Sequence, residues 1–93
     1  MDRYIGIDAH AESCTIVVMG PTGRRVKQQV VETQAKVLID FLKGVSGDKY
    51  VCLEEGQLAE WLFEALTPHA KEVVVVVPQA SRGRRATRGM RGR

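Results

Sequence analysis

Aromatic residues are scarce in this sequence, and long apolar runs are missing from it. Aromatic side chains form 5% of the 93 residues and hydrophobic residues of all kinds form 44%, so the core must be built from Val, Ile and Leu. No apolar run approaches the roughly 20 residues of a membrane-spanning helix. The first residues lack the charged and then apolar order of a signal peptide. We therefore expect a cytoplasmic protein that has no membrane partner.

Cysteine is also scarce, and the two cysteines are not arranged as metal ligands. Cys14 and Cys52 do not form a Cys-x-x-Cys pair, which excludes the common zinc motifs. Both lie in apolar stretches, where a free cysteine is usually buried. We expect two buried, reduced thiols. A chain of 93 residues also has room for one domain at most.

Acidic residues are absent after Glu72, and this absence divides the chain by charge. Residues 1–81 contain 8 Lys and Arg against 11 Asp and Glu, a net charge of −3, whereas residues 82–93 contain six arginines and no acid. The arginines expected to contact nucleic-acid phosphates are Arg82, Arg84, Arg85 and Arg88. Without aromatic residues for base stacking, such binding would be nonspecific and sensitive to salt. A translated tail without function is the simpler alternative.

The apolar pattern predicts five strands and two helices. Alternating and β-branched residues indicate strands at 3–8, 13–19, 24–32, 49–54 and 73–77. Apolar residues at helical spacing indicate one helix after Thr33, its expected N-cap, and a second between Leu58 and Pro68. Gly44 and Gly47 are suitable ends for the first helix. The five valines at 73–77 are typical of a strand that is buried on both faces.

This order of elements, βββαβαβ, predicts an α/β fold with a mixed five-stranded sheet. The first three strands form an antiparallel meander, and two right-handed crossovers then add parallel strands. The most economical strand order is 3-2-1-4-5, the ribonuclease H-like arrangement, with the helices packed on the sheet. Residues 1–78 are expected to form this domain. Residues 79–93 are expected to form a disordered Arg/Gly-rich tail.

Two acidic residues end neighbouring strands in this arrangement. Asp8 ends the strand 3–8 and Glu54 ends the strand 49–54. These two strands are parallel neighbours at the topological switch point, where open α/β sheets place their ligand crevice. Two carboxylates on strands about 4.8 Å apart repel each other unless a cation lies between them. Such a pair can hold a hard divalent cation such as Mg²⁺ for attack on a phosphodiester.

Each residue near this point also has a plainer interpretation. Asp8 can form a turn after its strand, and Glu54 or Glu55 can stabilise the start of the next helix. Gly6, on the same face as Asp8, either leaves room for a metal or phosphate or simply packs within its strand. His10 follows in the connecting loop, where a solvated histidine is the simpler interpretation. The joint position of Asp8 and Glu54 favours a functional site.

Two motifs around these acids occur in a recognisable order. Ile5-Gly6-Ile7-Asp8-Ala9-His10 precedes a β-branched strand and a Gly-Pro-Thr-Gly turn at 20–23. Val51-Cys52-Leu53-Glu54-Glu55-Gly56 precedes the Trp61-Leu62 helix and the valine strand. In this order and spacing, residues 3–78 resemble the start of transposases of the insertion-sequence 110 type. Each motif alone is modestly specific, and their order and spacing together are more so.

The resemblance implies an N-terminal RuvC-like domain of the DEDD type, in which four acids bind metal and act on DNA during transposition and recombination. Asp8 matches the first acid and Glu54 the second, with Glu55 as the alternative if the match is displaced by one residue. The resemblance also implies Mg²⁺ or Mn²⁺ as the cofactor. DNA and an element-encoded guide RNA are the implied partners, and a C-terminal domain supplies a serine nucleophile. The sequence leaves open whether the chain forms a homo-oligomer.

The sequence departs from this family pattern after Pro78. The family continues into a segment that carries the third and fourth acids, whereas here an Arg/Gly/Ala-rich stretch follows. Out-of-frame reading of GC-rich DNA yields such stretches, so our hypothesis is a truncated or frameshifted transposase fragment that is inactive alone. Sequencing the gene and finding no in-family continuation in either alternative frame would refute it. Ala11 also replaces a lysine that related chains often carry, which would weaken contact with nucleic acid.

Three other interpretations are open. The Arg-rich tail alone would make the chain a nonspecific nucleic-acid-binding module. An actin-like ATPase lobe also begins with a strand, an aspartate and a hairpin, but it usually has Gly and Ser or Thr where this chain has Ala9 and His10. A complete small Holliday-junction nuclease would require further acids after Glu72.

Overall fold

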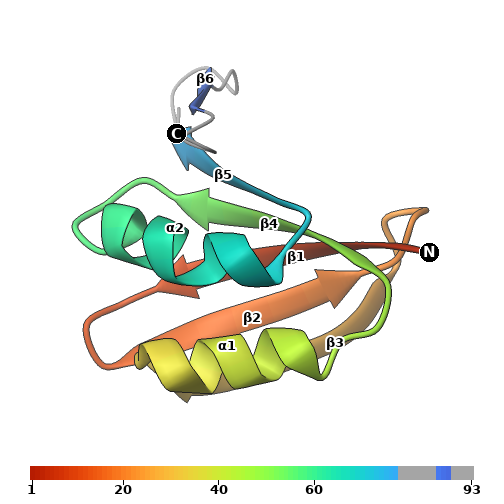
Figure 1. Cartoon of the computed structure of the whole chain (residues 1–93), viewed down its shortest axis with the longest axis horizontal. Helices are drawn as coiled ribbons and strands as arrows, with labels where there is room; N and C mark the ends of the chain where they lie inside the picture. The colour runs from red at the N-terminus through yellow and green to blue at the C-terminus, as the bar shows by residue number, and fades with distance from the viewer. Residues whose placement is uncertain (78–85, 89–93) are drawn as a thin grey trace.

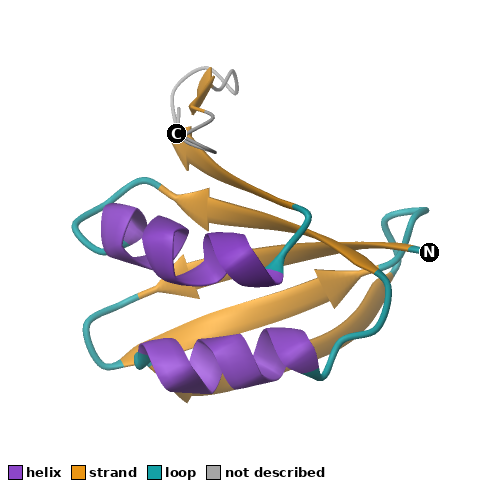
Figure 2. Ribbon diagram, viewed as in Figure 1, coloured by secondary structure: helices purple, strands orange, loops and turns teal. Residues whose placement is uncertain are grey.

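A computed structural model describes residues 1–77 and the backbone of residues 86–88. Its elements follow one another as three strands, a helix, a strand, a helix and two more strands (Figure 1; Figure 2). Their bounds are β1 (Asp2–Ala9), β2 (Ser13–Met19), β3 (Arg25–Glu32), α1 (Ala35–Lys43), β4 (Asp48–Glu54), α2 (Ala59–Leu66), the short 3-10 helix η1 (Thr67–His69), β5 (Glu72–Val77) and β6 (Ala86–Arg88).

The strands form one mixed sheet in the order β3-β2-β1-β4-β5-β6. β1 pairs antiparallel with β2, and β2 with β3, whereas β1 pairs parallel with β4 and β4 with β5. The predicted order 3-2-1-4-5 is therefore confirmed. The two crossovers place α1 and α2 over one face of the sheet (Figure 1).

The sixth strand lies in the stretch for which no regular structure was expected. β6 pairs antiparallel with β5, and its register joins Val75 to Arg88 and Val77 to Ala86. The expectation of a disordered tail over residues 79–93 stays a prediction, beside the finding that the backbone of residues 86–88 pairs with the end of β5. The rest of the predicted tail lies outside the described residues.

The core lies between the sheet and the two helices. Alternate strand residues point toward the helices, so Ile5, Ile16, Val51 and Val73 are each at most 1% exposed. The helices cover this face of the sheet with apolar residues spaced three and four apart in the sequence. Leu38, Leu42, Leu62, Phe63 and Leu66 belong to this set.

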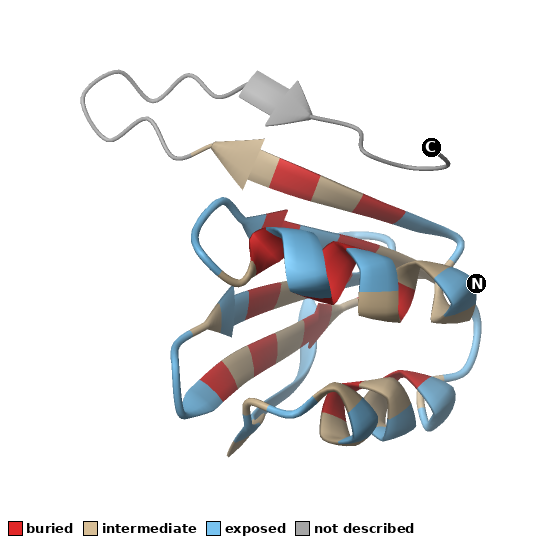
Figure 3. Ribbon diagram, turned by 60° about the vertical axis from the view of Figure 1, so that its left-hand side comes forward, coloured by how far each residue is buried: buried red, intermediate tan, exposed pale blue. Residues whose placement is uncertain are grey.

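The opposite face of the sheet is open in the part of the chain that the structure describes. Val73 and Val75 are buried under the helices, whereas Val74 and Val76, which point the other way, are only partly buried (Figure 3). The prediction that the valine strand is buried on both faces is therefore wrong, because both helices pack on the same face.

Three local predictions also differ from the structure. Cys14 is buried as expected, but Cys52 is exposed because its position in β4 points to the open face. The N-cap of α1 is Gln34 and not Thr33. Pro68 lies within η1, so the chain continues helically for one turn past the end of α2. The predicted turn after β2 is confirmed, because the amide of Gly23 donates to the carbonyl of Gly20 at 3.0 Å.

Candidate metal site

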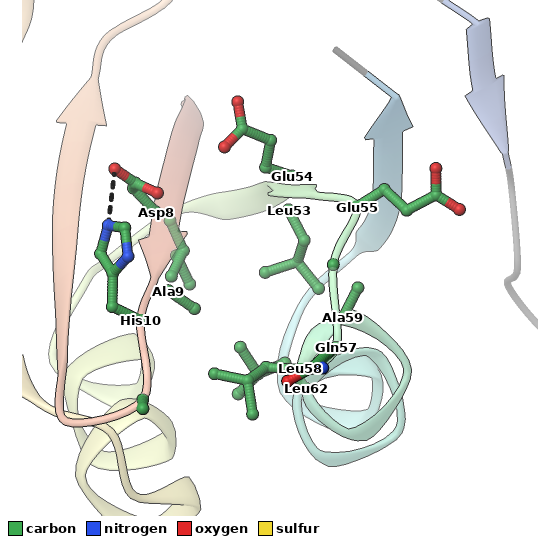
Figure 4. Close-up of a pocket in the computed structure, with 13 residues that line it drawn as sticks. Asp8, Ala9, His10, Leu53, Glu54, Glu55, Gln57, Leu58, Ala59 and Leu62 are labelled. Atoms are coloured by element: carbon green, nitrogen blue, oxygen red, sulfur yellow. Dashed lines mark ion pairs between the residues drawn. The ribbon is translucent and has the colours of Figure 1, made fainter.

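Asp8 and Glu54 lie side by side at the carboxyl ends of β1 and β4. The register of these parallel strands pairs Ile7 with Leu53, so Asp8 and Glu54 occupy the next position on each strand. Ile7 and Leu53 point into the core. The two acids therefore point to the open face, and in Figure 4 both project away from α2. This is the arrangement that the sequence predicted.

Glu55 does not share this arrangement. Its side chain projects toward β5 and away from Asp8 (Figure 4). Its backbone amide donates to the carbonyl of Val76 at 2.8 Å, which extends the pairing of β4 with β5 by one residue. Between the two alternatives from the sequence, the geometry brings Glu54 and not Glu55 next to Asp8.

His10 is the neighbour of Asp8 that the sequence underrated. Its Nε2 atom lies 3.4 Å from Oδ2 of Asp8. The side chains are 69% and 58% exposed, so the pair contributes little to folding stability. The contact places the imidazole beside the Asp8 carboxylate at the end of β1 (Figure 4). The spacing of two residues with a bend at the end of β1 was the only sequence signal for this contact.

Thr33 fixes the loop that carries His10. Its hydroxyl donates to the carbonyl of His10 at 2.6 Å and lies 3.3 Å from the buried sulfur of Cys14. The amide of His10 donates to Ser13 at 2.9 Å, and the amide of Thr33 donates to Glu12 at 3.1 Å. Thr33 thus positions the loop after β1 instead of capping α1. Nothing local in the sequence signals a contact between residues so far apart.

The two acids border hollows on both sides. A pocket of about 260 Å³ lies between the loop 9–11 and the start of α2, with an apolar floor that includes Leu53 and Leu62. A second pocket of about 380 Å³ lies on the open face beside Gly6 and Val17. Asp8 and Glu54 line both pockets. A Cβ atom built on Gly6 would meet no atom within 4 Å, so this glycine leaves open space next to the acids.

The donor set fits a hard divalent cation only as part of a site. Carboxylate oxygens suit Mg²⁺, which often takes one or two protein carboxylates and completes its shell with water and substrate phosphate. No group of three or more His, Cys, Asp or Glu suited to a metal occurs among the described residues. Asp8 and Glu54 are the residues that would hold the ion.

The predicted nucleic-acid-binding arginines are not brought to this site by the described structure. Arg82, Arg84 and Arg85 lie outside the described residues. Arg88 belongs to β6, where its backbone is in register with Val75. The expected contact between the arginines and nucleic acid stays a prediction from the sequence.

Comparison with known proteins adds no family to this picture. No protein-family model matches the chain, and no curated protein matches it. None of the helices in the described part of the chain is long and apolar enough to cross a membrane.

Proposed function

We propose that this chain is the N-terminal part of a cytoplasmic, RuvC-like DNA-processing domain of the transposase type, and that it presents half of a metal site. The position of Asp8 and Glu54 supports this proposal most directly. They end adjacent parallel strands at the point where the strand order reverses, which is where open α/β sheets bind their ligands. The resemblance of residues 3–78 to the transposase pattern supports DNA as the substrate.

Each residue of the site has a distinct task in this proposal. Asp8 and Glu54 hold the cation through carboxylate oxygens, and His10 orients Asp8. Thr33 holds the loop that carries His10. Gly6 leaves space on the open face for the phosphate group of the substrate. The bound Mg²⁺ would neutralise charge on a phosphodiester and lower the pKa of a water molecule.

The chain alone should show little or no cleavage. Two carboxylates bind a hard cation weakly, because water must supply most of the remaining ligands. The family pattern uses four acids, and two of them have no counterpart in this sequence. A metal-dependent cleavage by the purified chain that disappears in Asp8→Ala would refute this part of the proposal.

The same two strands provide an internal control for metal binding. Asp2 and Asp48 stand in register at the amino ends of β1 and β4, so they form a second acidic pair on the same face. This pair lies away from the switch point, and neither aspartate forms an ion pair with a histidine in the described part of the chain. Simple attraction of a cation to two carboxylates should act at both ends. A functional site should act at the Asp8 end alone.

The test is a titration of the isotope-labelled chain with Mg²⁺ and Mn²⁺, followed by NMR, with Asp8→Asn and Asp48→Asn as matched variants. We expect shifts and Mn²⁺ broadening at residues 6–10 and 53–56, which Asp8→Asn abolishes and Asp48→Asn leaves intact. Equal effects at both ends, or none in a folded sample, would refute the metal site. A DNA oligonucleotide that shifts only the tail, without metal and only at low salt, would favour the nonspecific binding module instead.

A further inference from the structure

The two edges of the sheet are closed to different degrees. On one side β6 pairs with the end of β5. On the other side β3, a strand of eight residues, ends the sheet with no strand beside it among the described residues. Seven of its eight residues are exposed, including Val26 and Val30 at 55% and 62%. A long exposed edge that carries apolar side chains is a surface on which another strand can pair.

The usual protection of such an edge is weak here. Lysine on an edge strand normally projects outward and discourages pairing. The ammonium group of Lys27 instead lies 5.1 Å from the centre of the Phe41 ring, so it is turned toward α1. The bulge opposite Val18 and Met19 affects only the start of β3. Residues 27–32 therefore form a regular stretch with a free backbone edge.

The charges along β3 are complementary to the same strand running in the opposite direction. Arg24 and Arg25 lie at its amino end, and Glu32 lies at its carboxyl end. Gln28 and Gln29, at the centre, are neutral. Parallel pairing of two copies would place like charges together. Antiparallel pairing places the arginines of each copy beside the glutamate of the other.

We propose that two copies of this chain associate through β3, antiparallel about a two-fold axis near Gln28 and Gln29, to form one continuous sheet. Arg25 of one protomer then lies next to Glu32 of the partner subunit, and this ion pair occurs twice because the interface is isologous. Glu32 accepts a hydrogen bond from Gln34 through one carboxylate oxygen, which leaves the other oxygen for the arginine. Backbone hydrogen bonds supply the affinity, and the charges select the antiparallel direction.

This interface does not use the acids of the proposed metal site. β3 is separated from β1 by β2, so Asp8 and Glu54 stay accessible in the dimer. The proposal of the dimer and the proposal of the metal site can therefore be confirmed or refuted independently of each other. A dimer made from one strand on each side is small, so we expect association in the weak class of protein interfaces.

Charge reversal in trans is the test. In Arg25→Glu alone, each pair becomes Glu with Glu, and in Glu32→Arg alone, each pair becomes Arg with Arg. A mixture of the two variants restores both pairs, one with its original signs and the other with the signs exchanged. Analytical ultracentrifugation and concentration-dependent amide shifts should show that each single variant associates about tenfold or more weakly than the unmodified chain at low salt. The mixture should return to within about threefold of it.

Lys71→Glu serves as the control for Arg25→Glu, because it makes the same change in net charge at an exposed position on the other side of the sheet from β3. It should leave association unchanged, and so should Asp8→Asn. The proposal is overturned if the unmodified chain stays monomeric up to millimolar concentration. It is also overturned if the mixture associates no better than each variant alone, or if the shifts gather at Tyr4 and Tyr50 on the open face instead of on β3.

Discussion

Gly47 is the position where one added methyl group should harm the fold most visibly. Its φ angle is +99°, a conformation that residues with a side chain rarely adopt. A Cβ atom built there collides with the carbonyl oxygen of Met1. That same oxygen accepts a hydrogen bond from the amide of Asp48 at 3.0 Å, which joins the beginnings of β1 and β4. Gly47→Ala therefore strains the backbone and also displaces the start of the central strand pair.

Gly23 offers a matched comparison. Its φ angle is +85°, but a Cβ atom there meets no atom within 4 Å. Gly23→Ala should cost the conformational strain alone, about 1–2 kcal/mol. Gly47→Ala should cost that amount and also the lost hydrogen bond of Asp48, about 1 kcal/mol more. The gain from restricting the unfolded chain is the same for both variants and cancels in the comparison.

Urea unfolding followed by circular dichroism measures both variants against the unmodified chain. For a domain of this size, 1 kcal/mol corresponds to roughly 4–8 °C in Tm, so thermal melting resolves the difference as well. We expect the order unmodified chain, Gly23→Ala, Gly47→Ala from most to least stable. Equal losses in the two variants would show that the contact with Met1 has no energetic weight, and the reasoning would be refuted.

Three further predictions concern the core, the open face of the sheet and the loss of stability at acid pH. Leu62 is 1% exposed, so Leu62→Ala leaves a cavity in the core that the surrounding side chains fill only in part. We expect the free energy of unfolding, measured by urea titration, to fall by about 2–5 kcal/mol. Gly6→Ala should stabilise the fold by about 0.5–1 kcal/mol, since its Cβ meets open space, yet weaken any phosphate-dependent metal binding measured by NMR. The hydrogen bond from Lys36 lowers the pKa of Asp40. The ionised carboxylate therefore makes a small contribution to folding stability that is present at neutral pH and is lost as the pH falls through the folded-state pKa. Asp40→Asn should remove this part of the decrease in Tm at acid pH.

The order of strands and helices was predictable because local patterns carry it. Ile5 and Ile7 alternate with residues of the open face, and the apolar residues of α1 and α2 recur at helical spacing. Short connections and right-handed crossovers then leave one economical sheet. The exposure of Cys52 could not be predicted in this way. Its apolar neighbours Val51 and Leu53 face the helices, and only the position of both helices on one face exposes the residue between them.

Some features of the candidate site were likewise predictable from the sequence, and others were not. Asp8 and Glu54 each end a strand in the sequence, so the strand order was enough to place them together. The choice of Glu54 over Glu55 required the pairing of β4 with β5, which turns Glu55 toward Val76. The support of Thr33 for the loop of His10 required the fold to bring the segment after β3 beside that loop.

The sequence by itself determined the secondary structure, the strand order and the two acids at the switch point, because these depend on spacing along the chain and on the handedness of connections. Only the tertiary structure decided that Thr33 holds the loop of His10 and that Ala86–Arg88 pair beside β5. These features depend on contacts between residues far apart in the chain.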